Sequence, residues 1–377
     1  MEDKYIVKKE NTLSKINSIK DGCIQCGKCV KSCLMLQEYC NKPKEFFTNV
    51  CESKNIETII PFSCSLCGKC NLVCPKNLDI QDAFMGLRED IVEQNNGISP
   101  LKGHETIHMH QKFSFSPLFT GIVKESDKVE RLFMPGCSLS AYNYELVLKV
   151  YEYIKDKIPG TGLLLGCCGR PTKDLGESDE FKKKYSNLDN MIKNSGAKEI
   201  ITACQSCLKV VGEESPEYVV KSLWTVLRDL GVPEGAKGIG SESDLEFSIK
   251  DSCASMRNIE LQDSIRSIMD ELGYKVKEQK EKNVSCCGTG GMIHTVNTDL
   301  SKKIMLDSAM KCDTDYIVTY CGGCRNSMVQ GGKHSLHILD LVFKDIWTSK
   351  SSMPTAVGSL KSWMNRFQVK RKSKTIK

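Results

Sequence analysis

The chain has 377 residues, of which 40% are apolar and 27% are charged, an ordinary composition for a folded protein of two or three domains. No apolar run approaches the roughly eighteen residues that a helix needs to span a bilayer, so the sequence predicts no membrane-spanning segment. The formal net charge of +6 comes from residues 348–377, which hold eight basic residues and no acidic one. The rest of the chain is nearly neutral, so we expect no nucleic-acid partner.

Cysteine is the residue whose usage is unusual. The chain contains 21 cysteines, and it does not begin with the charged and apolar regions of a secretory signal. Thiols in such number indicate a reducing compartment, where they bind metals instead of forming disulfides. We therefore expect a cytoplasmic protein.

Two cysteine runs follow an N-terminal arm, residues 1–20, which we expect to pack on the first domain. The first run is Cys23-Ile-Gln-Cys26-Gly-Lys-Cys29-Val-Lys-Ser-Cys33, and the second is Cys64-Ser-Leu-Cys67-Gly-Lys-Cys70-Asn-Leu-Val-Cys74-Pro75. Both have the spacing C-x2-C-x2-C-x3-C, although Leu34 replaces the proline in the first run. Gly27 and Gly68 allow the backbone to turn closely. A helix is predicted over residues 80–93.

This spacing resembles that of two-cluster bacterial ferredoxins, in which three thiolates of one run hold one [4Fe-4S] cubane and the fourth binds the other. The resemblance implies a mainly helical domain over residues 21–95. It also implies one cubane at Cys23, Cys26, Cys29 and Cys74, and a second at Cys64, Cys67, Cys70 and Cys33. Zinc or disulfides are less favoured, because zinc ribbons use two separated C-x2-C pairs. Cys40 and Cys51 are left over, and we expect them to be buried thiols.

Residues 96–130 contain scattered glycine and proline and are expected to form an extended linker. His104, His108 and His110 lie in this segment at spacings that could bind a metal. The surrounding pattern does not indicate a helix, so a packing or solvated role is favoured for all three.

A repeat follows in residues 131–235 and 236–347, with matching cysteines 116 to 119 positions apart. Short apolar segments alternate with amphipathic ones, which predicts two α/β units with parallel sheets and sites at the carboxyl ends of strands. The strands are expected at 131–136, 163–165, 198–203, 245–249 and 315–320. The helices are expected at 144–157, 180–195, 259–272 and 300–310.

The repeated cysteines resemble those of the cysteine-rich CCG domain. The first set is Cys137, Cys167, Cys168, Cys204 and Cys207, and the second is Cys253, Cys286, Cys287, Cys321 and Cys324. Two such domains behind a two-cluster ferredoxin unit resemble the D subunit of heterodisulfide reductase and its relatives. These include iron-sulfur subunits of anaerobic glycerol-3-phosphate dehydrogenase and glycolate oxidase. The resemblance implies one or two non-cubane [4Fe-4S] clusters held by the ten cysteines, which would be the catalytic residues.

The resemblance implies an iron-sulfur oxidoreductase subunit that passes electrons through two cubanes to a site acting on a disulfide or on thiols. The alternative is an electron-transfer subunit of a flavin-dependent glycerol-3-phosphate, glycolate or lactate dehydrogenase. A third is a structural-metal or redox-sensing protein, with zinc in the CCG units. No dinucleotide fingerprint is present, so flavin or nicotinamide must come from a partner, either a flavoprotein or a membrane cytochrome.

Five further features lie outside the cysteine sets. The glycine-rich run from Gly288 to Gly291 could admit a substrate, and His294 could donate a proton, although a packing or surface role is favoured for it and for His337. Cys312 is expected to be a buried thiol. In the tail, residues 348–377, an apolar stripe of Leu360, Trp363, Met364 and Phe367 with basic neighbours predicts peripheral contact with the inner face of a membrane. A helix packed on its own protein and a disordered tail are the alternatives, and together they are as favoured as membrane contact.

Overall fold

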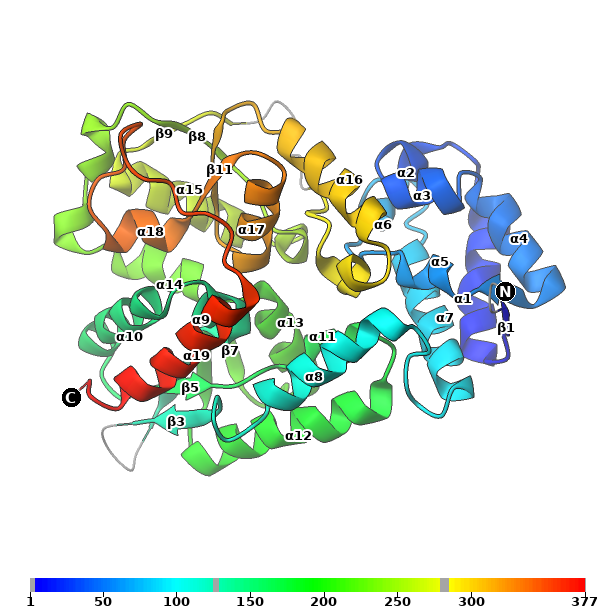
Figure 1. Ribbon diagram of the computed structural model, residues 1–377, viewed down its shortest axis with the longest axis horizontal. Coiled ribbons are helices and arrows are strands. Elements are labelled where there is room, and N and C mark those ends of the chain that lie inside the picture. Colours follow the sequence, from blue (N-terminus) through cyan, green and yellow to red (C-terminus); the bar gives the residue numbers. More distant parts are fainter. Residues whose placement is uncertain (1–3, 125–128, 279–284, 377) are drawn as a thin grey trace. The chain divides into compact units, whose positions relative to one another are not determined.

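The computed structural model describes residues 4–124, 129–278 and 285–376, whose helices and strands are labelled in Figure 1. These residues form two compact units. Unit 1 takes in the described parts of 1–111, 171–183 and 285–307, and unit 2 takes in those of 112–170, 184–284 and 308–377. Each unit consists of three separate stretches of the chain, so the division into units does not test the predicted domain boundaries. Across the described residues, no helix has both the length and the apolar character needed to cross a membrane.

Unit 1 is mainly helical, as predicted for the ferredoxin-like region, and α1 lies against both α4 and α7 (Figure 1). Its elements are β1 (Lys4–Ile6), α1 (Glu10–Gly22), α2 (Lys28–Lys31), α3 (Leu34–Tyr39), α4 (Pro43–Ser53), β2 (Asn55–Glu57), α5 (Ile59–Phe62), α6 (Lys69–Leu72), α7 (Ile80–Gln94), the 3-10 helix η1 (Lys102–His104), α8 (Glu105–Ser114), α11 (Arg170–Asp174), the 3-10 helix η5 (Gly290–Thr295) and α16 (Thr298–Met310). Helices α8, α11 and α16 extend past the limits of the unit.

Helix α7 shows how the sequence builds this unit. Asp79 precedes it, and its carboxylate accepts a hydrogen bond from the backbone N–H of Asp82 at 3.0 Å, which fixes the start of the helix. Phe84, Leu87 and Ile91 then recur at helical spacing and are buried in the core of the unit. The predicted helix at 80–93 is therefore confirmed.

Unit 2 contains two sheets, one for each copy of the repeat. The elements of the first copy are β3 (Gly121–Val123), β4 (Arg131–Met134), α9 (Gly136–Tyr142), α10 (Tyr144–Lys157), β5 (Thr161–Leu165), α12 (Ser178–Ser195), β6 (Glu199–Thr202), α13 (Gln205–Glu214), β7 (Val219–Ser222) and α14 (Leu223–Leu230). The remaining elements, which build the connection, the second copy and the tail, are η2 (Glu234–Ala236), η3 (Ile239–Glu242), β8 (Glu246–Ile249), η4 (Cys253–Ser255), α15 (Ile259–Leu272), β9 (Lys275–Val276), β10 (Tyr316–Thr319), α17 (Gly322–Gln330), β11 (His334–His337), α18 (Ile338–Phe343) and α19 (Ser359–Ser373).

The two sheets have the same strand order. In the first it is β3-β5-β4-β6-β7, and in the second it is β9-β8-β10-β11 in the corresponding direction. All pairs are parallel except β3 with β5, which are antiparallel. The repeat and its parallel sheets are therefore confirmed, and β3, β7, β9 and β11 are strands that the sequence analysis did not anticipate.

The prediction of an extended linker is wrong for residues 105–114, which form α8. Helix α8 buries Ile107, Gln111 and Ser114, so its buried face is largely polar and leaves no hydrophobic period in the sequence. His108 lies on this helix, and its Nε2 is 2.6 Å from Oε1 of Glu177.

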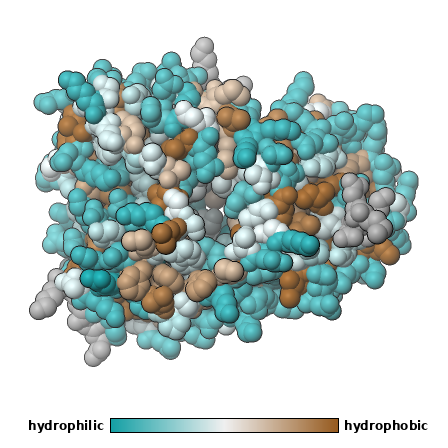
Figure 2. Space-filling view, in the orientation of Figure 1, coloured by the Kyte–Doolittle hydropathy of each residue, from teal (hydrophilic) through white to brown (hydrophobic). Residues whose placement is uncertain are grey.

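The tail forms helix α19, which packs against α9 and α10 of unit 2 (Figure 1). The amide of Asn365 donates hydrogen bonds to the carbonyls of Ala141 and Tyr142, at 2.8 and 2.9 Å. Packing of this helix on its own protein is therefore confirmed, and contact with a membrane stays a prediction. The predicted apolar stripe, however, is not the buried face: Leu360 is 78% exposed, Met364 50% and Phe367 39%, and Figure 2 shows apolar side chains gathered over this helix.

Candidate metal centres

One cavity lies at the first cysteine run. It has a volume of about 260 Å³ and is lined by Cys23, Cys26 and Cys29 together with Cys74 from the second run. These are the four cysteines that the ferredoxin resemblance assigns to one cubane, and a cavity ringed by four thiols fits a group of that size and chemistry. Cys26 is exposed at this cavity, so its rim reaches the solvent.

The two cysteine runs fold alike. Gly27 and Gly68 have φ values of 72° and 76°, and each is followed by one turn of helix, α2 or α6, that carries the third cysteine. The predicted close turns at these glycines are confirmed. At Leu34, which stands where the second run has proline, helix α3 begins.

A second group of thiols comprises Cys33, Cys64 and Cys70. Burial, and then the nearby thiol of Cys64, raise the pKa of Cys33 to about 12. Burial also raises the pKa of Cys70, with smaller contributions from Cys64 and Cys33. Cys70 is buried and Cys33 and Cys64 are partly buried, and the three thiols interact, so thiolates there would be stabilised by a positive group such as a metal.

Cys67, the fourth cysteine predicted for this second group, forms a hydrogen bond with Cys286, and this bond lowers the pKa of Cys286. Cys286 and Cys287 were predicted as ligands of the second CCG set, and they lie in unit 1. The second cysteine run therefore has a fifth thiol beside it. This neighbour could not be deduced from spacing, because more than 200 positions separate the two residues.

The first CCG set is brought together within unit 2. Cys137 follows β4, Cys167 and Cys168 follow β5, and Cys204 follows β6, so the set lies at the carboxyl ends of three neighbouring parallel strands. A hydrogen bond with Cys137, followed by burial, raises the pKa of Cys167.

The rest of this set is linked in the same way. The thiol of Cys207 interacts with both Cys168 and Cys204, which raises the pKa of Cys207. The hydrogen bond from Cys207 lowers the pKa of Cys204, so Cys204 is the thiol of this pair that ionises first. Pairwise interactions therefore connect all five thiols, whose sulfur atoms are the soft ligands that an iron-sulfur cluster prefers.

In the second copy, unit 2 contains Cys253, Cys321 and Cys324. Cys253 follows β8 and Cys321 follows the neighbouring parallel strand β10. The hydroxyl of Tyr320 joins the two strand ends, since it accepts a hydrogen bond from the backbone N–H of Ser252 at 3.2 Å and lies 2.6 Å from the hydroxyl of Ser255. The strand ends that carry Cys253 and Cys321 are thus held together.

The remaining cysteines behave differently. Cys40 and Cys312 are buried, as expected, and the Cys312 thiol donates to the carbonyl of Ser308 at 3.6 Å. Cys51 is only partly buried, and its thiol donates to Oδ1 of Asn17 at 3.3 Å.

The histidines are mainly structural. His104 is fully buried, its Nδ1 lies 2.6 Å from the Ser99 hydroxyl, and burial lowers its pKa to about 3. The side chain of His337 caps α18, where it accepts a hydrogen bond from the backbone N–H of Leu339. His294 is exposed and close to Cys287, so its predicted proton-donor role stays a prediction. The space beside Gly290 and Gly291, proposed above for a substrate, is filled by the backbone of Cys64 and Ser65.

Arg88 is the residue beside these centres that the sequence analysis missed. It is fully buried in α7, and it donates a hydrogen bond to the carbonyl of Cys64 in the second cysteine run. A signal was present, because Arg88 falls among Phe84, Leu87 and Ile91, on the apolar face of the predicted helix.

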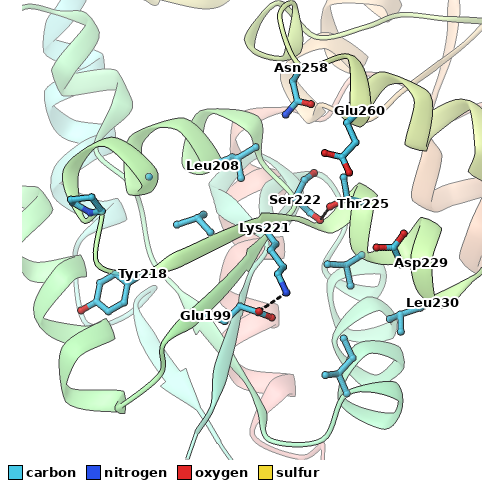
Figure 3. Close-up of a pocket in the computed structure, with 15 residues that line it drawn as sticks. Glu199, Leu208, Tyr218, Lys221, Ser222, Thr225, Asp229, Leu230, Asn258 and Glu260 are labelled. Carbon is cyan, nitrogen blue, oxygen red and sulfur yellow. Dashed lines mark hydrogen bonds and ion pairs between the residues drawn. The ribbon is translucent and has the colours of Figure 1, made fainter.

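An open cleft of about 740 Å³ lies away from the cysteines, along β7 and between α13, α14 and the start of α15 (Figure 3). No thiol lines it. Its charged residues are paired: Glu199 with Lys221 at 2.6 Å, as Figure 3 marks, and Asp229 and Glu260 with Arg228 at 2.8 and 3.3 Å. We therefore do not place the redox chemistry in this cleft.

Comparison with known families agrees with the cysteine patterns. Residues 22–79 match a 4Fe-4S dicluster domain, and residues 132–212 and 249–329 each match the cysteine-rich CCG domain. The two CCG matches contain all ten repeated cysteines.

Similar proteins are found in species of Methanosarcina and Methanothermobacter. The D subunit of the dihydromethanophenazine:CoB–CoM heterodisulfide reductase of Methanosarcina mazei is 23% identical, over 86% of this chain and 92% of that protein. The corresponding protein of Methanosarcina barkeri is 22% identical over the same shares. The B subunit of the fumarate reductase (CoM/CoB) of Methanothermobacter marburgensis is 21% identical, over 86% of this chain and 72% of that protein. With its dicluster domain and two CCG domains, the chain belongs to the family of iron-sulfur oxidoreductase subunits that resemble the D subunit of heterodisulfide reductase.

Proposed function

We propose that this chain reduces a disulfide, or oxidises two thiols in the reverse direction, at clusters held by its CCG cysteines. The observation that carries the proposal is the convergence of Cys137, Cys167, Cys168, Cys204 and Cys207 at the ends of three adjacent strands. The kinship with heterodisulfide reductase subunits supports it. In this proposal the second set, Cys253, Cys286, Cys287, Cys321 and Cys324, holds a similar cluster.

The reaction needs two electrons and two protons. The S–S bond of the substrate breaks, each sulfur gains one electron and one proton, and two thiols leave. Iron-sulfur clusters, when bound, supply electrons singly and offer iron atoms that bind sulfur. The electrons would come from a reduced partner protein, and the two cysteine runs would hold the cubanes that carry them.

The residues of the chain prepare the site for this chemistry. Three cysteines of the first CCG set, Cys167, Cys168 and Cys207, are each at most 3% exposed, so water is largely excluded from their sulfur atoms, whereas Cys137 and Cys204 are partly exposed. Near the second set, exposed His294 lies beside Cys287 and is our candidate for supplying a proton to a leaving thiolate.

The alternative of an electron-transfer subunit for a flavin-dependent glycerol-3-phosphate, glycolate or lactate dehydrogenase is less favoured. The three relatives described above are subunits of heterodisulfide and fumarate reductases whose names specify CoM and CoB. All ten repeated cysteines are also present, whereas cubanes alone would need none of them.

The partner is, in this proposal, a flavoprotein or a membrane cytochrome. Contact with a membrane surface is supported by α19, whose exposed Leu360, Met364 and Phe367 are accompanied by four exposed cations. Those cations are Lys361, Arg371 and Lys372 in the helix and Lys374 directly after it. Such a face suits the boundary of an anionic lipid layer.

The proposal is tested with anaerobically purified protein, reduced viologen as electron donor, and the CoM–CoB heterodisulfide or bis(2-hydroxyethyl) disulfide as probes. We expect two viologen radicals to be consumed, and two thiols to appear, for each disulfide cleaved. Cys168→Ser should abolish turnover, whereas Cys312→Ser, the matched loss of a buried thiol outside both sets, should retain it. Disulfide cleavage that survives Cys168→Ser, or no cleavage by wild-type protein loaded with clusters, would contradict the proposal.

A further inference from the structure

Arg88 joins three separate stretches of chain within unit 1. Its Nε donates to the carbonyl of Pro61 at 2.9 Å, and Nη1 donates to the carbonyls of Asp174 and, at 3.0 Å, Gly291. Its Nη2 donates to the carbonyl of Cys64. A fully buried guanidinium is costly, and here its donors are satisfied by backbone carbonyls.

Two of these carbonyls belong to loops that carry proposed cluster ligands. Cys64 opens the second cysteine run, and Gly291 lies four residues beyond Cys287. The loops are in close contact, because a Cβ added at Gly291 would lie 2.4 Å from the Cys64 carbonyl oxygen, and one at Gly290 would lie 2.5 Å from that of Ser65. The hydrogen bond between Cys67 and Cys286 joins the same two loops.

We propose that Arg88 is a positioning residue with two effects: its charge raises the reduction potential of the cubane at Cys33, Cys64, Cys67 and Cys70, and its hydrogen bonds hold that cubane's loop against the Cys286–Cys287 loop. The inference rests on the ligand set of the proposed function. In this inference, the cubane held by the second cysteine run lies directly against a CCG loop, whereas the cubane at Cys23 does not.

The physical reason is electrostatic. Reduction adds one electron, supplied by the partner or by a chemical reductant, and so makes the cubane and its thiolates more negative. A fixed positive charge buried beside Cys64 stabilises that added negative charge strongly, because little water screens it. The cavity at Cys23, Cys26, Cys29 and Cys74 is bordered by an exposed cysteine, so its cubane should depend far less on Arg88.

The test is a redox titration of the anaerobic protein with dithionite, in which electron paramagnetic resonance measures the reduced fraction of each cubane. In Arg88→Met, the second cubane should become harder to reduce, with its reduced-to-oxidised ratio at the wild-type midpoint falling about tenfold. The first cubane is the internal control and should keep its potential, and Cys26→Ser identifies its signal. Arg88→Lys, which keeps the charge, should fall between wild type and Arg88→Met.

Lys15→Met is the matched control, because it also removes a positive charge next to α7, where Lys15 pairs with Asp82 at 2.9 Å. It should leave both cubanes unchanged. Loss of only the second cubane in Arg88→Met would also support the proposal. Two outcomes would overturn the proposal. In the first, Arg88→Met leaves the potentials of both cubanes unchanged. In the second, Arg88→Met loses both cubanes and Arg88→Lys restores both. These cubane readings do not depend on disulfide turnover, so failure of the proposed function would be seen separately.

Discussion

At the scale of single residues, the two Cys-Cys-Gly turns are built alike. The N–H of Gly169 donates to Sγ of Cys167 at 3.5 Å, and the N–H of Gly288 donates to Sγ of Cys286 at 3.3 Å. Both glycines have positive φ, 75° and 84°, a region that other residues rarely adopt. The third position of the motif is therefore glycine because the backbone must turn back to donate to the first cysteine's sulfur.

Gly136 has an equally strict role in the first CCG set. It has a φ of 75°, and a Cβ at this position would lie 2.8 Å from Cβ of Cys204. We expect Gly136→Ala to destabilise the protein by about 2 kcal/mol and to displace Cys137 or Cys204, with loss of the iron held by this set. Iron analysis and urea unfolding of the purified variant measure both effects.

The matched control is Gly212→Ala in helix α13, where an added Cβ would meet no atom within 4 Å. Alanine should stabilise this helix by about 0.5–1 kcal/mol and leave the iron content unchanged. Equal iron contents in the Gly136→Ala and Gly212→Ala proteins would show that close packing at Gly136 does not shape the site.

His337 should make stability depend on pH. Burial lowers its pKa to about 4, whereas in the unfolded chain the ordinary value is about 6.5. The unfolded state therefore binds the proton first as the pH falls, so the stability that neutral His337 contributes is complete above pH 6.5 and is lost progressively toward pH 4.

His337→Asn keeps a residue that caps helices and removes the titration. Between pH 6.5 and 4, the wild-type free energy of unfolding should fall more steeply than that of His337→Asn, by up to about 1.4 kcal/mol per pH unit. Urea unfolding at several pH values measures the two slopes, and parallel slopes would refute the assignment.

At the scale of elements, the repeat could be predicted closely from sequence. The bounds of α10 and α15 coincide with the predicted 144–157 and 259–272, because Asn143 and Asn258 cap their starts and apolar residues recur at helical spacing. Helix α8 escaped prediction because Gln111 and Ser114 lie on its buried face. Hydrophobic periodicity cannot detect a helix whose buried side chains are polar.

The orientation of α19 was also beyond sequence reasoning, because polar contacts determine it. Arg366 is buried, with its Nη1 donating to the Ser114 hydroxyl at 3.0 Å and its guanidinium 4.4 Å from the centre of the Trp363 ring. These contacts turn the apolar Leu360, Met364 and Phe367 outward. The same contacts explain why the apolar stripe, whose helical spacing is typical of a buried face, is exposed and could contact a membrane.

We expect α19 to bind vesicles that contain phosphatidylglycerol, more weakly as salt is raised, because both apolar contact and basic charge contribute. Replacement of Leu360, Met364 and Phe367 by serine should weaken binding about tenfold or more in a sedimentation assay. The control is serine at the exposed Val219 and Ile259, outside α19, which should bind as wild type. Equal binding by all three proteins would exclude α19 as the contact.

At the scale of the whole molecule, the cysteine spacing indicated the family and the candidate ligands but not their neighbours. The cavity lined by Cys23, Cys26, Cys29 and Cys74 agrees with the crossed arrangement that the two runs imply. The contact of Cys286 with Cys67, and the place of Arg88 between their loops, follow from tertiary packing. Contacts between residues far apart in the chain cannot be predicted from the spacing of neighbouring residues.

The most direct test of the account is a count of iron and sulfide on anaerobic protein, with electron paramagnetic resonance of the same oxidised sample before and after a thiol is added. Four clusters of four irons predict about sixteen irons and as many sulfides per chain, and a new paramagnetic signal when the thiol binds at a CCG site. About eight irons with no response to thiol would mean that only the cubanes are present, and would contradict the proposed disulfide chemistry.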